Sequence, residues 1–199
     1  MREDTEVRSI EPHILIRAYE TGFFPMADSR TGPISWYSPD PRAIIPLDGL
    51  KISRSLRQII NKNIFRITVN AAFEKVMRHC AGRTDTWISE EVIQSYLKLY
   101  NIGHAHSIEI WKEGVLVGGL YGVSIESAFF GESMFSIVRD ASKVALVYLV
   151  DHLRNAGYQL LDTQFMTPHL RRLGAVEIPR NEYLDILQRA MNKKNSFVH

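Results

Sequence analysis

Residues 141–165 read ASKVALVYLVDHLRNAGYQLLDTQF, a helical pattern that runs directly into a short apolar strand. In the first part, apolar residues recur at helical spacing on one face, and Gly157 is placed to end the helix. The strand carries two polar residues, Asp162 and Gln164, which are predicted to point the same way because side chains alternate faces along a strand. Burying a carboxylate is costly unless it is paired or hydrogen-bonded, so this pair needs an explanation.

Three strand patterns precede the helix: HSIEIW (106–111), VLVGGLYGVS (115–124) and SAFFGESMF (127–135). Antiparallel strands, a helix packed on them and a strand that returns predict an α+β fold. The order is similar to that of the N-acyltransferase (GNAT) core, where a central sheet splays open to admit an acyl donor and an amine.

The remaining segments are predicted from periodicity and from turn residues. Residues 22–50 contain five prolines and several aromatic residues, which favours an ordered surface loop over a helix or a disordered linker. Ser89 is a plausible N-cap, because two glutamates follow it in the first turn. The other predicted elements are helices over 12–20, 71–80, 90–100 and from about 181, and a strand over 65–70.

The composition suits one large domain or two small ones, with 199 residues, 45% of them hydrophobic. No run approaches the ~18 apolar residues of a membrane span, and the first residues, MREDTEVRS, are charged rather than apolar. Cys80 is the single cysteine, which excludes an intrachain disulfide and a cysteine zinc cluster. We therefore expect a soluble cytoplasmic protein.

The net charge of +2 does not by itself indicate a nucleic-acid-binding protein, but the basic residues are unevenly distributed. The stretch KISRSLRQIINKNIFR (51–66) holds five cations and no acid. Such a face is compatible with docking onto phosphates, but charge runs are usually surface, so the run alone favours an ordinary solvated helix face.

Two segments hold residues suited to chemistry. Asp162 and Gln164 could relay a hydrogen bond and orient or deprotonate an amine, or Asp162 could be a structural anchor. In FFGESMF (129–135), Glu132 lies among apolar neighbours, as in a ligand pocket with one charged group, although a solvent-facing glutamate at a strand end fits equally well.

Other motifs are weak or absent. His104 and His106 have strand spacing for a metal, but a third ligand is not apparent, so structural histidines are expected. Neither a G-x-S-x-G elbow nor a phosphate-binding glycine loop occurs. Trp87 could stack on a nucleobase or belong to the core.

Together these segments resemble the bacterial leucyl/phenylalanyl-tRNA–protein transferases over roughly residues 15–187. The most specific matching stretches are SPDPRA, GHAHSIE and GESMFS, and the others include GFFPM, ISRSLR, TWIS, VGGLYGV, ASKVAL, LLDTQ and PHLRRLGAVEIPRNEY. The resemblance implies a small N-terminal domain (1–50) and a GNAT-like catalytic domain entered through the basic segment (51–199). It also implies transfer of leucine or phenylalanine, with methionine possible, from aminoacyl-tRNA to proteins with N-terminal Arg or Lys, which marks them for N-degron degradation.

The resemblance also implies roles for single residues. Asp162 and Gln164 would form the catalytic pair, and the basic segment would meet the tRNA acceptor stem through Arg54, Arg57 and Lys62. Six residues would contact the aminoacyl-adenosine end: Leu120, Phe129, Glu132, Ser133 and Met134 around the aminoacyl group, and Trp87 on the terminal adenosine. The donor ester is already activated, so no cofactor or metal is expected, and a monomer is plausible at this size.

The role of Asp162 can be examined by comparing its ordinary pKa with that of the amine. Direct proton transfer from an α-ammonium (pKa ~7.7–8.0) to an ordinary aspartate (pKa ~3.9) is uphill by ~4 units, or about 5 kcal/mol. We therefore expect Asp162 and Gln164 to orient the amine and to accept its proton only as the nitrogen becomes cationic. An apolar pocket separates side chains that differ by one methylene by only ~1–3 kcal/mol, so selection among large apolar amino acids is expected to be loose.

The chain departs from the family pattern in places. Met26 stands where some members have tryptophan, and members often have a longer N-terminus. Two other functions remain in view. An acetyl-CoA-dependent N-acetyltransferase would need a Q/R-x-x-G-x-G/A loop, and the nearest stretch, RRLGAV (171–176), ends in valine. A noncatalytic tRNA- or peptide-binding module would use the basic segment and leave Asp162 structural.

Overall fold

The structure is a computed structural model that describes residues 9–83 and 86–198. The charged start of the chain, residues 1–8, lies outside the described residues. The elements in chain order are α1 (Pro12–Glu20), β1 (Phe24–Ala27), β2 (Ile34–Tyr37), β3 (Arg42–Ile44), α2 (Arg54–Asn61), β4 (Arg66–Val69), α3 (Phe73–Ala81), α4 (Glu90–Asn101), β5 (Ala105–Lys112), β6 (Val115–Ile125), β7 (Ala128–Ser136), α5 (Ala141–Ala156), β8 (Leu160–Gln164), α6 (Pro168–Arg172), β9 (Val176–Ile178) and α7 (Arg180–Met191).

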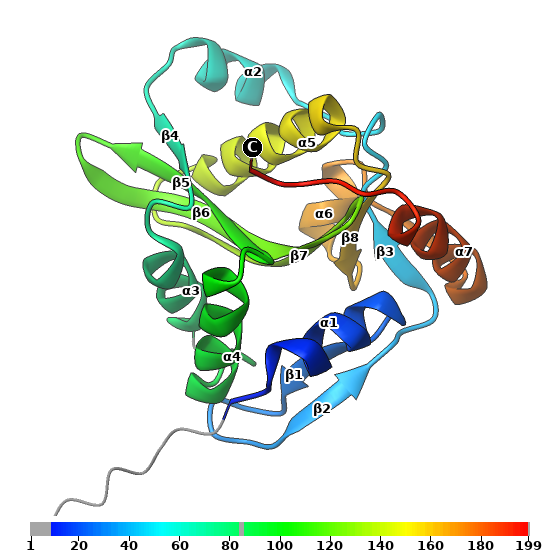
Figure 1. The fold of residues 1–199 in the computed structure, drawn as a ribbon. Coiled ribbons are helices and arrows are strands. Elements are labelled where there is room, and N and C mark those ends of the chain that lie inside the picture. Colours follow the sequence, from blue (N-terminus) through cyan, green and yellow to red (C-terminus); the bar gives the residue numbers. More distant parts are fainter. Residues whose placement is uncertain (1–8, 84–85, 199) are drawn as a thin grey trace, which may run out of the picture.

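A seven-stranded sheet with the order β4-β5-β6-β7-β8-β3-β9 organises the molecule (Figure 1). Strands β4 to β7 pair antiparallel. Strand β8 pairs parallel with β7, and helix α5 forms the crossover that connects the two strands. The pairing of β7 with β8 ends at Phe130 and Asp162, although β7 continues to Ser136. The sheet therefore opens between these two strands, which is the splayed arrangement that the sequence predicted.

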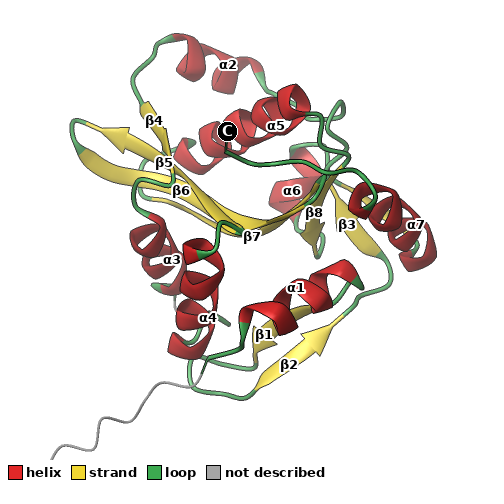
Figure 2. Ribbon diagram, in the orientation of Figure 1, coloured by secondary structure: helices red, strands yellow, loops and turns green. Residues whose placement is uncertain are grey.

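Helices cover both faces of this sheet (Figure 2). Helices α5 and α2 lie on one face, while α3, α4 and α1 lie on the other (Figure 1). Each face has its own apolar core. One gathers side chains of α1, α3, α4 and α7, and the other gathers those of α2, α5 and α6. No helix among the described residues is long and apolar enough to cross a bilayer.

The α+β class and most predicted elements are confirmed. Ser89 caps α4 by accepting a hydrogen bond from the Val92 amide, and Gly157 follows α5 with φ 77° in the left-handed region. The strand pattern over 158–165 is shorter than expected, because β8 covers only Leu160–Gln164.

The expectation of a loop over residues 22–50 is wrong in part. Strands β1 and β2 form a two-stranded hairpin, and β3 lies inside the large sheet between β8 and β9. Pro25 is compatible with the hairpin because β1 has a partner on one side only, so its missing N–H leaves no gap in a central ladder. The domain boundary expected at residue 50 stays a prediction; β3 precedes it and shares its sheet with later strands.

Candidate active site

A cleft of about 820 Å³ opens where β7 and β8 separate. Its walls come from β6, β7 and β8, from α5 and α6, and from the end of α3 with residues of the segment after it. Apolar side chains form much of the lining: Leu120, Met134, Leu146, Leu149, Leu161 and Leu170. Polar and charged side chains, among them Arg83, Glu132 and Gln164, complete the lining, so the cleft combines an apolar wall with orienting polar groups, as ligand sites do.

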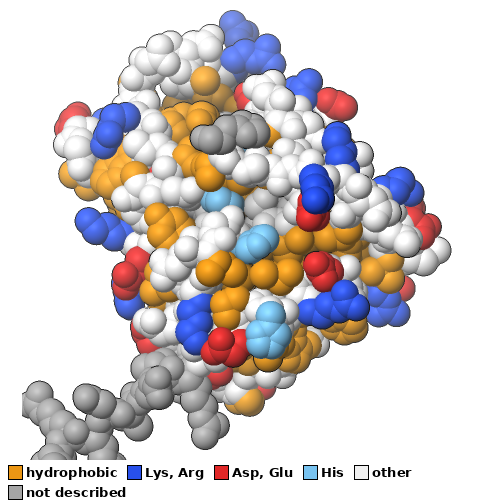
Figure 3. All heavy atoms as spheres, in the orientation of Figure 1, with side chains coloured by type: hydrophobic (Ala, Val, Ile, Leu, Met, Phe, Trp, Pro, Cys, Tyr) orange, Lys and Arg blue, Asp and Glu red, His pale blue; other side chains and the backbone are white. Residues whose placement is uncertain are grey.

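Six of the eight residues predicted for the catalytic pair and the aminoacyl-adenosine end line this cleft: Trp87, Leu120, Glu132, Ser133, Met134 and Gln164. Phe129 does not line it. That ring is fully buried and lies 5.1 Å from the Phe197 ring, in the layer behind the cleft wall. Asp162 does not line it either. The three residues predicted to meet tRNA are exposed on and just after α2, outside the cleft lining: Arg54, Arg57 and Lys62. Lys and Arg side chains gather at this end of the molecule, at the top of Figure 3.

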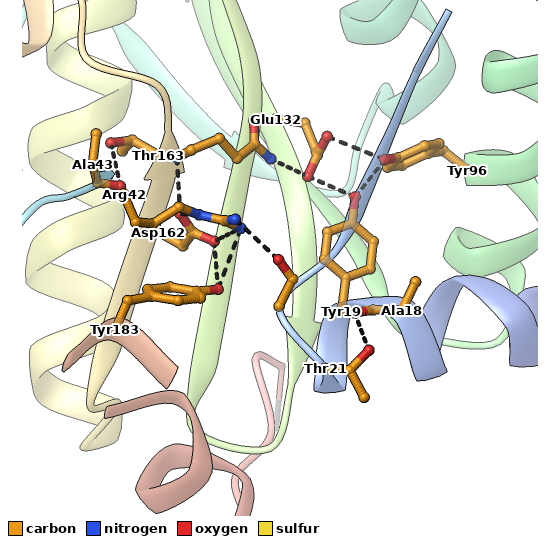
Figure 4. Close-up of polar contacts among 12 residues, drawn as sticks. Ala18, Tyr19, Thr21, Arg42, Ala43, Tyr96, Glu132, Asp162, Thr163 and Tyr183 are labelled. Atoms are coloured by element: carbon orange, nitrogen blue, oxygen red, sulfur yellow. Dashed lines mark hydrogen bonds and ion pairs between the residues drawn. The ribbon is translucent and has the colours of Figure 1, made fainter. Parts of the chain in front are cut away.

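Asp162 is fully buried in the middle of β8, where it forms an ion pair with Arg42 of β3. Arg42 donates to the carboxylate twice, from Nε at 3.0 Å and from Nη2 at 2.6 Å (Figure 4). The Tyr183 hydroxyl donates to it at 2.8 Å, and so does the backbone N–H of Gln164, also at 2.8 Å. Four donors therefore surround Asp162, and its oxygens are occupied before any substrate arrives.

Gln164 ends the strand in an uncommon conformation. Its φ is 65°, in the left-handed region, which a non-glycine residue occupies only when its surroundings support it. The hydrogen bond from its amide to Asp162 supplies that support. Because the alternation of the strand ends here, Gln164 reaches a different partner from Asp162 and donates from Nε2 to Glu132 Oε1 at 2.8 Å.

Glu132 is the buried carboxylate of the cleft, and two tyrosines bind it (Figure 4). Tyr19 of α1 donates to Oε1 at 2.7 Å, and Tyr96 of α4 donates to Oε2 at 3.1 Å. The two hydroxyl oxygens also contact each other. Tyr19, Tyr96 and Glu132 thus make three oxygen–oxygen contacts with one another, but while Glu132 is ionised only the two tyrosine hydroxyls carry a proton. Protonation of the Glu132 carboxyl supplies a proton for the third contact.

The position of Glu132 changes its acidity. Burial raises the pKa of this carboxyl to about 7, even though hydrogen bonds from the tyrosines and Gln164 favour the charged form, and the nearby Asp162 adds to the rise. Burial, together with the charge of Glu132, holds the pKa of Tyr19 and of Tyr96 well above its ordinary value. Glu132 is therefore a cleft group that can gain or lose a proton near neutral pH.

Sequence reasoning missed four residues of this network: Tyr19, Arg42, Tyr96 and Tyr183. They come from α1, β3, α4 and α7. Arg42 and Tyr19 each bind a carboxylate more than a hundred residues away along the chain. No local spacing signals such a contact. The nearest signal was Arg42 within SPDPRA, which marked the segment and left the role of the residue open.

The two histidines of GHAHS do not line the cleft and instead contact neighbouring residues on other segments of the chain. His104 Nδ1 lies 3.1 Å from the Ser124 carbonyl oxygen, and His106 Nδ1 lies 3.0 Å from Asn70 Nδ2. His106 also stacks on Phe197, and burial lowers the pKa of its imidazole to about 4. His106 is therefore neutral at pH 7.

Tyr121 lines the cleft and carries a buried hydroxyl whose effect on stability can be measured. Among the residues described, its hydroxyl is the one buried side-chain nitrogen or oxygen without a hydrogen-bond partner. An unsatisfied buried polar group costs roughly 1–3 kcal/mol, so Tyr121→Phe is expected to raise the free energy of unfolding by about 1 kcal/mol. Urea denaturation checks this. The control is Tyr158→Phe, which removes a hydroxyl that contacts Ser124 at 2.6 Å and should lower stability. Equal losses in both variants would contradict the prediction.

Comparison with known proteins places the chain among named families. The family model described as leucyl/phenylalanyl-tRNA protein transferase matches residues 44–188, and the model for the N-terminal domain of that transferase matches residues 8–40. A leucyl/phenylalanyl-tRNA–protein transferase of Chlorobaculum tepidum is 54% identical over 188 residues, which cover 92% of this chain and 97% of that protein. One of Gloeobacter violaceus is 51% identical over 183 residues, which cover 92% and 95%.

Similar solved structures are more distant in sequence. L-PGS from Bacillus licheniformis has a TM-score of 0.44 at 16% identity, and the match covers 82% of this chain and 56% of that one. A GCN5-related N-acetyltransferase from Kribbella flavida has a TM-score of 0.43 at 14% identity, over 80% of this chain and 58% of that one. The full-length matches at about half identity and the two family models decide the assignment, and the chain belongs to the leucyl/phenylalanyl-tRNA–protein transferase family.

Proposed function

We propose that this chain transfers leucine or phenylalanine from aminoacyl-tRNA to the α-amine of proteins that begin with Arg or Lys. The observation that carries the proposal is the cleft itself, in which an apolar wall faces a single buried carboxyl whose pKa is about 7. The apolar wall suits the side chain of the donor amino acid. The carboxyl suits proton transfer to and from an amine.

The donor side chain would lie against the apolar wall, and Leu120 and Met134 would contact it beside Leu146 of α5. Trp87, which also lines the cleft, would stack on the terminal adenosine. Phe129 would act from behind the wall, because it is fully buried. Ser133, which accepts a hydrogen bond from Arg83 at 2.8 Å, would hold that arginine at the edge of the cleft.

Glu132 would move the proton of the reaction. The α-amine nitrogen attacks the ester carbonyl carbon, the new C–N bond forms, and Glu132 accepts the proton that the nitrogen loses. The bond from the carbonyl carbon to the ribose oxygen then breaks, and Glu132 returns the proton to that oxygen. A carboxyl of pKa about 7 is within ~1 unit of an α-ammonium at ~7.7–8.0, so the transfer costs about 1 kcal/mol rather than about 5.

Asp162 would act as a positioning residue. Its four donors leave it no free oxygen for the amine, and its bond to the Gln164 amide supports the conformation that brings Gln164 to Glu132. Gln164 would then orient the proton-accepting carboxyl and contact the amine. This division differs from the sequence-based hypothesis, in which Asp162 itself takes the proton.

The acceptor preference follows from charge. An N-terminal Arg or Lys brings a cationic side chain beside the α-ammonium, and the ionised form of Glu132 would attract both. The proposal keeps the sequence-based expectation of a monomeric cytoplasmic enzyme that uses no cofactor.

Transfer of radiolabelled leucine from Leu-tRNA to a peptide that begins with Arg tests the proposal, and the same peptide beginning with Ala is the control. Label is expected in the Arg peptide only. Absence of transfer from both Leu-tRNA and Phe-tRNA would overturn the proposal. A requirement for acetyl-CoA would favour an N-acetyltransferase, and tRNA binding without transfer would favour a binding module.

A further inference from the structure

A second, smaller cavity of about 350 Å³ lies where the starts of α2 and α5 meet α6. Its lining differs from that of the cleft because it is rich in cationic side chains. The residues are Lys51, Ile52, Ser53, Leu56, Lys143, His169, Arg172 and Leu173. None of the three residues predicted to bind tRNA lines it.

The charges of this cavity are only partly neutralised. Within the described residues, neither Lys51 nor Arg172 forms an ion pair, and both are exposed. Lys143 pairs with Asp140 at 2.5 Å. Three cations therefore face one carboxylate, and the surplus favours an anion.

The charges of two of these cations also act on His169, which lines the same cavity. Burial lowers the pKa of its imidazole, the charges of Lys143 and Arg172 lower it further, and Asp140 works in the opposite direction. Lys143 also lies in the first turn of the 16-residue helix α5, whose N-terminal end carries a partial positive charge. The side chains and the helix thus act with the same sign on whatever occupies the cavity.

The cavity adjoins the cleft. His169 lines both, and Ser142, which lines the cleft, precedes Lys143, which lines the cavity. A substrate that extends from the cleft along α6 would therefore reach Lys143 and Arg172 next.

We propose that this basic cavity, defined by Lys51, Lys143, His169 and Arg172, binds a backbone phosphate of the tRNA acceptor strand near its aminoacylated end. The inference rests on the proposed function and adds a phosphate site to it. Of the two substrates, the nucleic acid carries the negative charge. The proposed acceptor carries two positive charges at its N-terminus, and the cavity would repel it.

The double variant Lys51→Glu/Arg172→Glu tests the proposal with two donors. Aminoacyl-tRNA has the backbone phosphates, while 3′-aminoacyl-adenosine has the same reacting ester and none of them. The ratio of kcat/KM for aminoacyl-tRNA to kcat/KM for aminoacyl-adenosine is expected to fall about tenfold or more in the variant. A change of less than twofold in this ratio, or an equal loss with both donors, would overturn the proposal.

The matched control is Arg189→Glu/Lys194→Glu, which changes the net charge equally at two exposed cations of α7 and the C-terminal segment. The control should leave the ratio unchanged, and an equal fall would show a general charge effect instead of a site. Binding of uncharged tRNA across salt concentrations gives a second readout. The slope of log Kd against log salt is expected to fall by roughly 0.7 to 1.4 in the cavity variant. If the wild-type chain transfers from neither donor, the proposed function fails, while this slope still tests the cavity.

Discussion

Replacing Glu132 with glutamine is expected to lower kcat for leucyl or phenylalanyl transfer by a factor of about 10² to 10⁴, the range that general acid–base groups contribute. Glutamine has the shape of the protonated carboxyl and can both accept from Tyr19 and donate to Tyr96, so the network around it should survive. What it lacks is the capacity to take and return a proton. Single-turnover kinetics with saturating aminoacyl-tRNA measures the effect on the chemical step.

The pH dependence identifies the group. The α-amine of the acceptor contributes its own inflection to the pH–rate profile at ~7.7–8.0. Glu132 must be ionised to accept a proton, so the wild-type rate should show a further inflection at the pKa of Glu132, about 7. In Glu132→Gln the residual rate should lose this inflection. The neighbours that face Glu132 would not replace it: Tyr19, Tyr96 and Tyr121 titrate well above neutral pH, because burial and the charge of Glu132 raise each pKa.

Glu113→Gln is the matched control, since Glu113 is exposed in the turn between β5 and β6. It should keep both the rate and the inflection. A Glu132→Gln variant with near-native kcat would contradict the proposed proton transfer. A large loss of kcat with an unchanged inflection near pH 7 would assign the titration to another group.

The same pKa shift makes a statement about stability. The folded state holds a proton on Glu132 up to about pH 7, whereas the unfolded chain releases it near 4.5. The folded state therefore binds more protons between these values, so this contribution to stability is complete below about pH 4.5 and is lost as pH rises through 7. The loss is about 3 kcal/mol for a shift of this size, and it should be absent from the pH profile of Glu132→Gln.

The sequence predicted the regular parts of this fold because their signals are local. The helix over 141–157 and the strands around it follow from periodicity, from Gly157 and from β-branched and aromatic residues. The three-residue strand β3 carries no such signal and exists because β8 and β9 pair on its two sides. A short strand between distant partners is set by tertiary pairing, which a local pattern does not contain.

The candidate site divides in the same way. The LLDTQ and GESMF segments marked Asp162, Gln164 and Glu132, and all three meet in the structure. Which of them holds a titratable proton depended on partners from α1, β3, α4 and α7. Asp162 is paired with a buried arginine and Glu132 with tyrosines, and on this difference we propose positioning for Asp162 and proton acceptance for Glu132.

Replacing Arg42 with leucine is expected to cost about 3 to 5 kcal/mol of stability, because it leaves Asp162 as a buried charge without its partner. The guanidinium is fully buried between two rings, 4.7 Å from the centre of Phe24 and 4.4 Å from that of Tyr183. It also donates from Nη1 to the Gly22 carbonyl at 3.0 Å, which links the end of α1 to the sheet. Denaturant unfolding of the purified variant measures the loss.

A second substitution tests whether the loss of stability comes from the buried charge of Asp162 that is left without a partner. Asp162→Asn in the Arg42→Leu background removes the charge while its side-chain oxygen can still accept from the Gln164 amide. The double variant is therefore expected to be more stable than Arg42→Leu alone, by roughly half of the 3 to 5 kcal/mol. In the wild-type background the same Asp162→Asn change should destabilise, because it removes one partner of an intact pair. If Asp162→Asn lowered stability equally in both backgrounds, the ion pair would not be the source of the effect, and packing of the Arg42 side chain between its two rings would be.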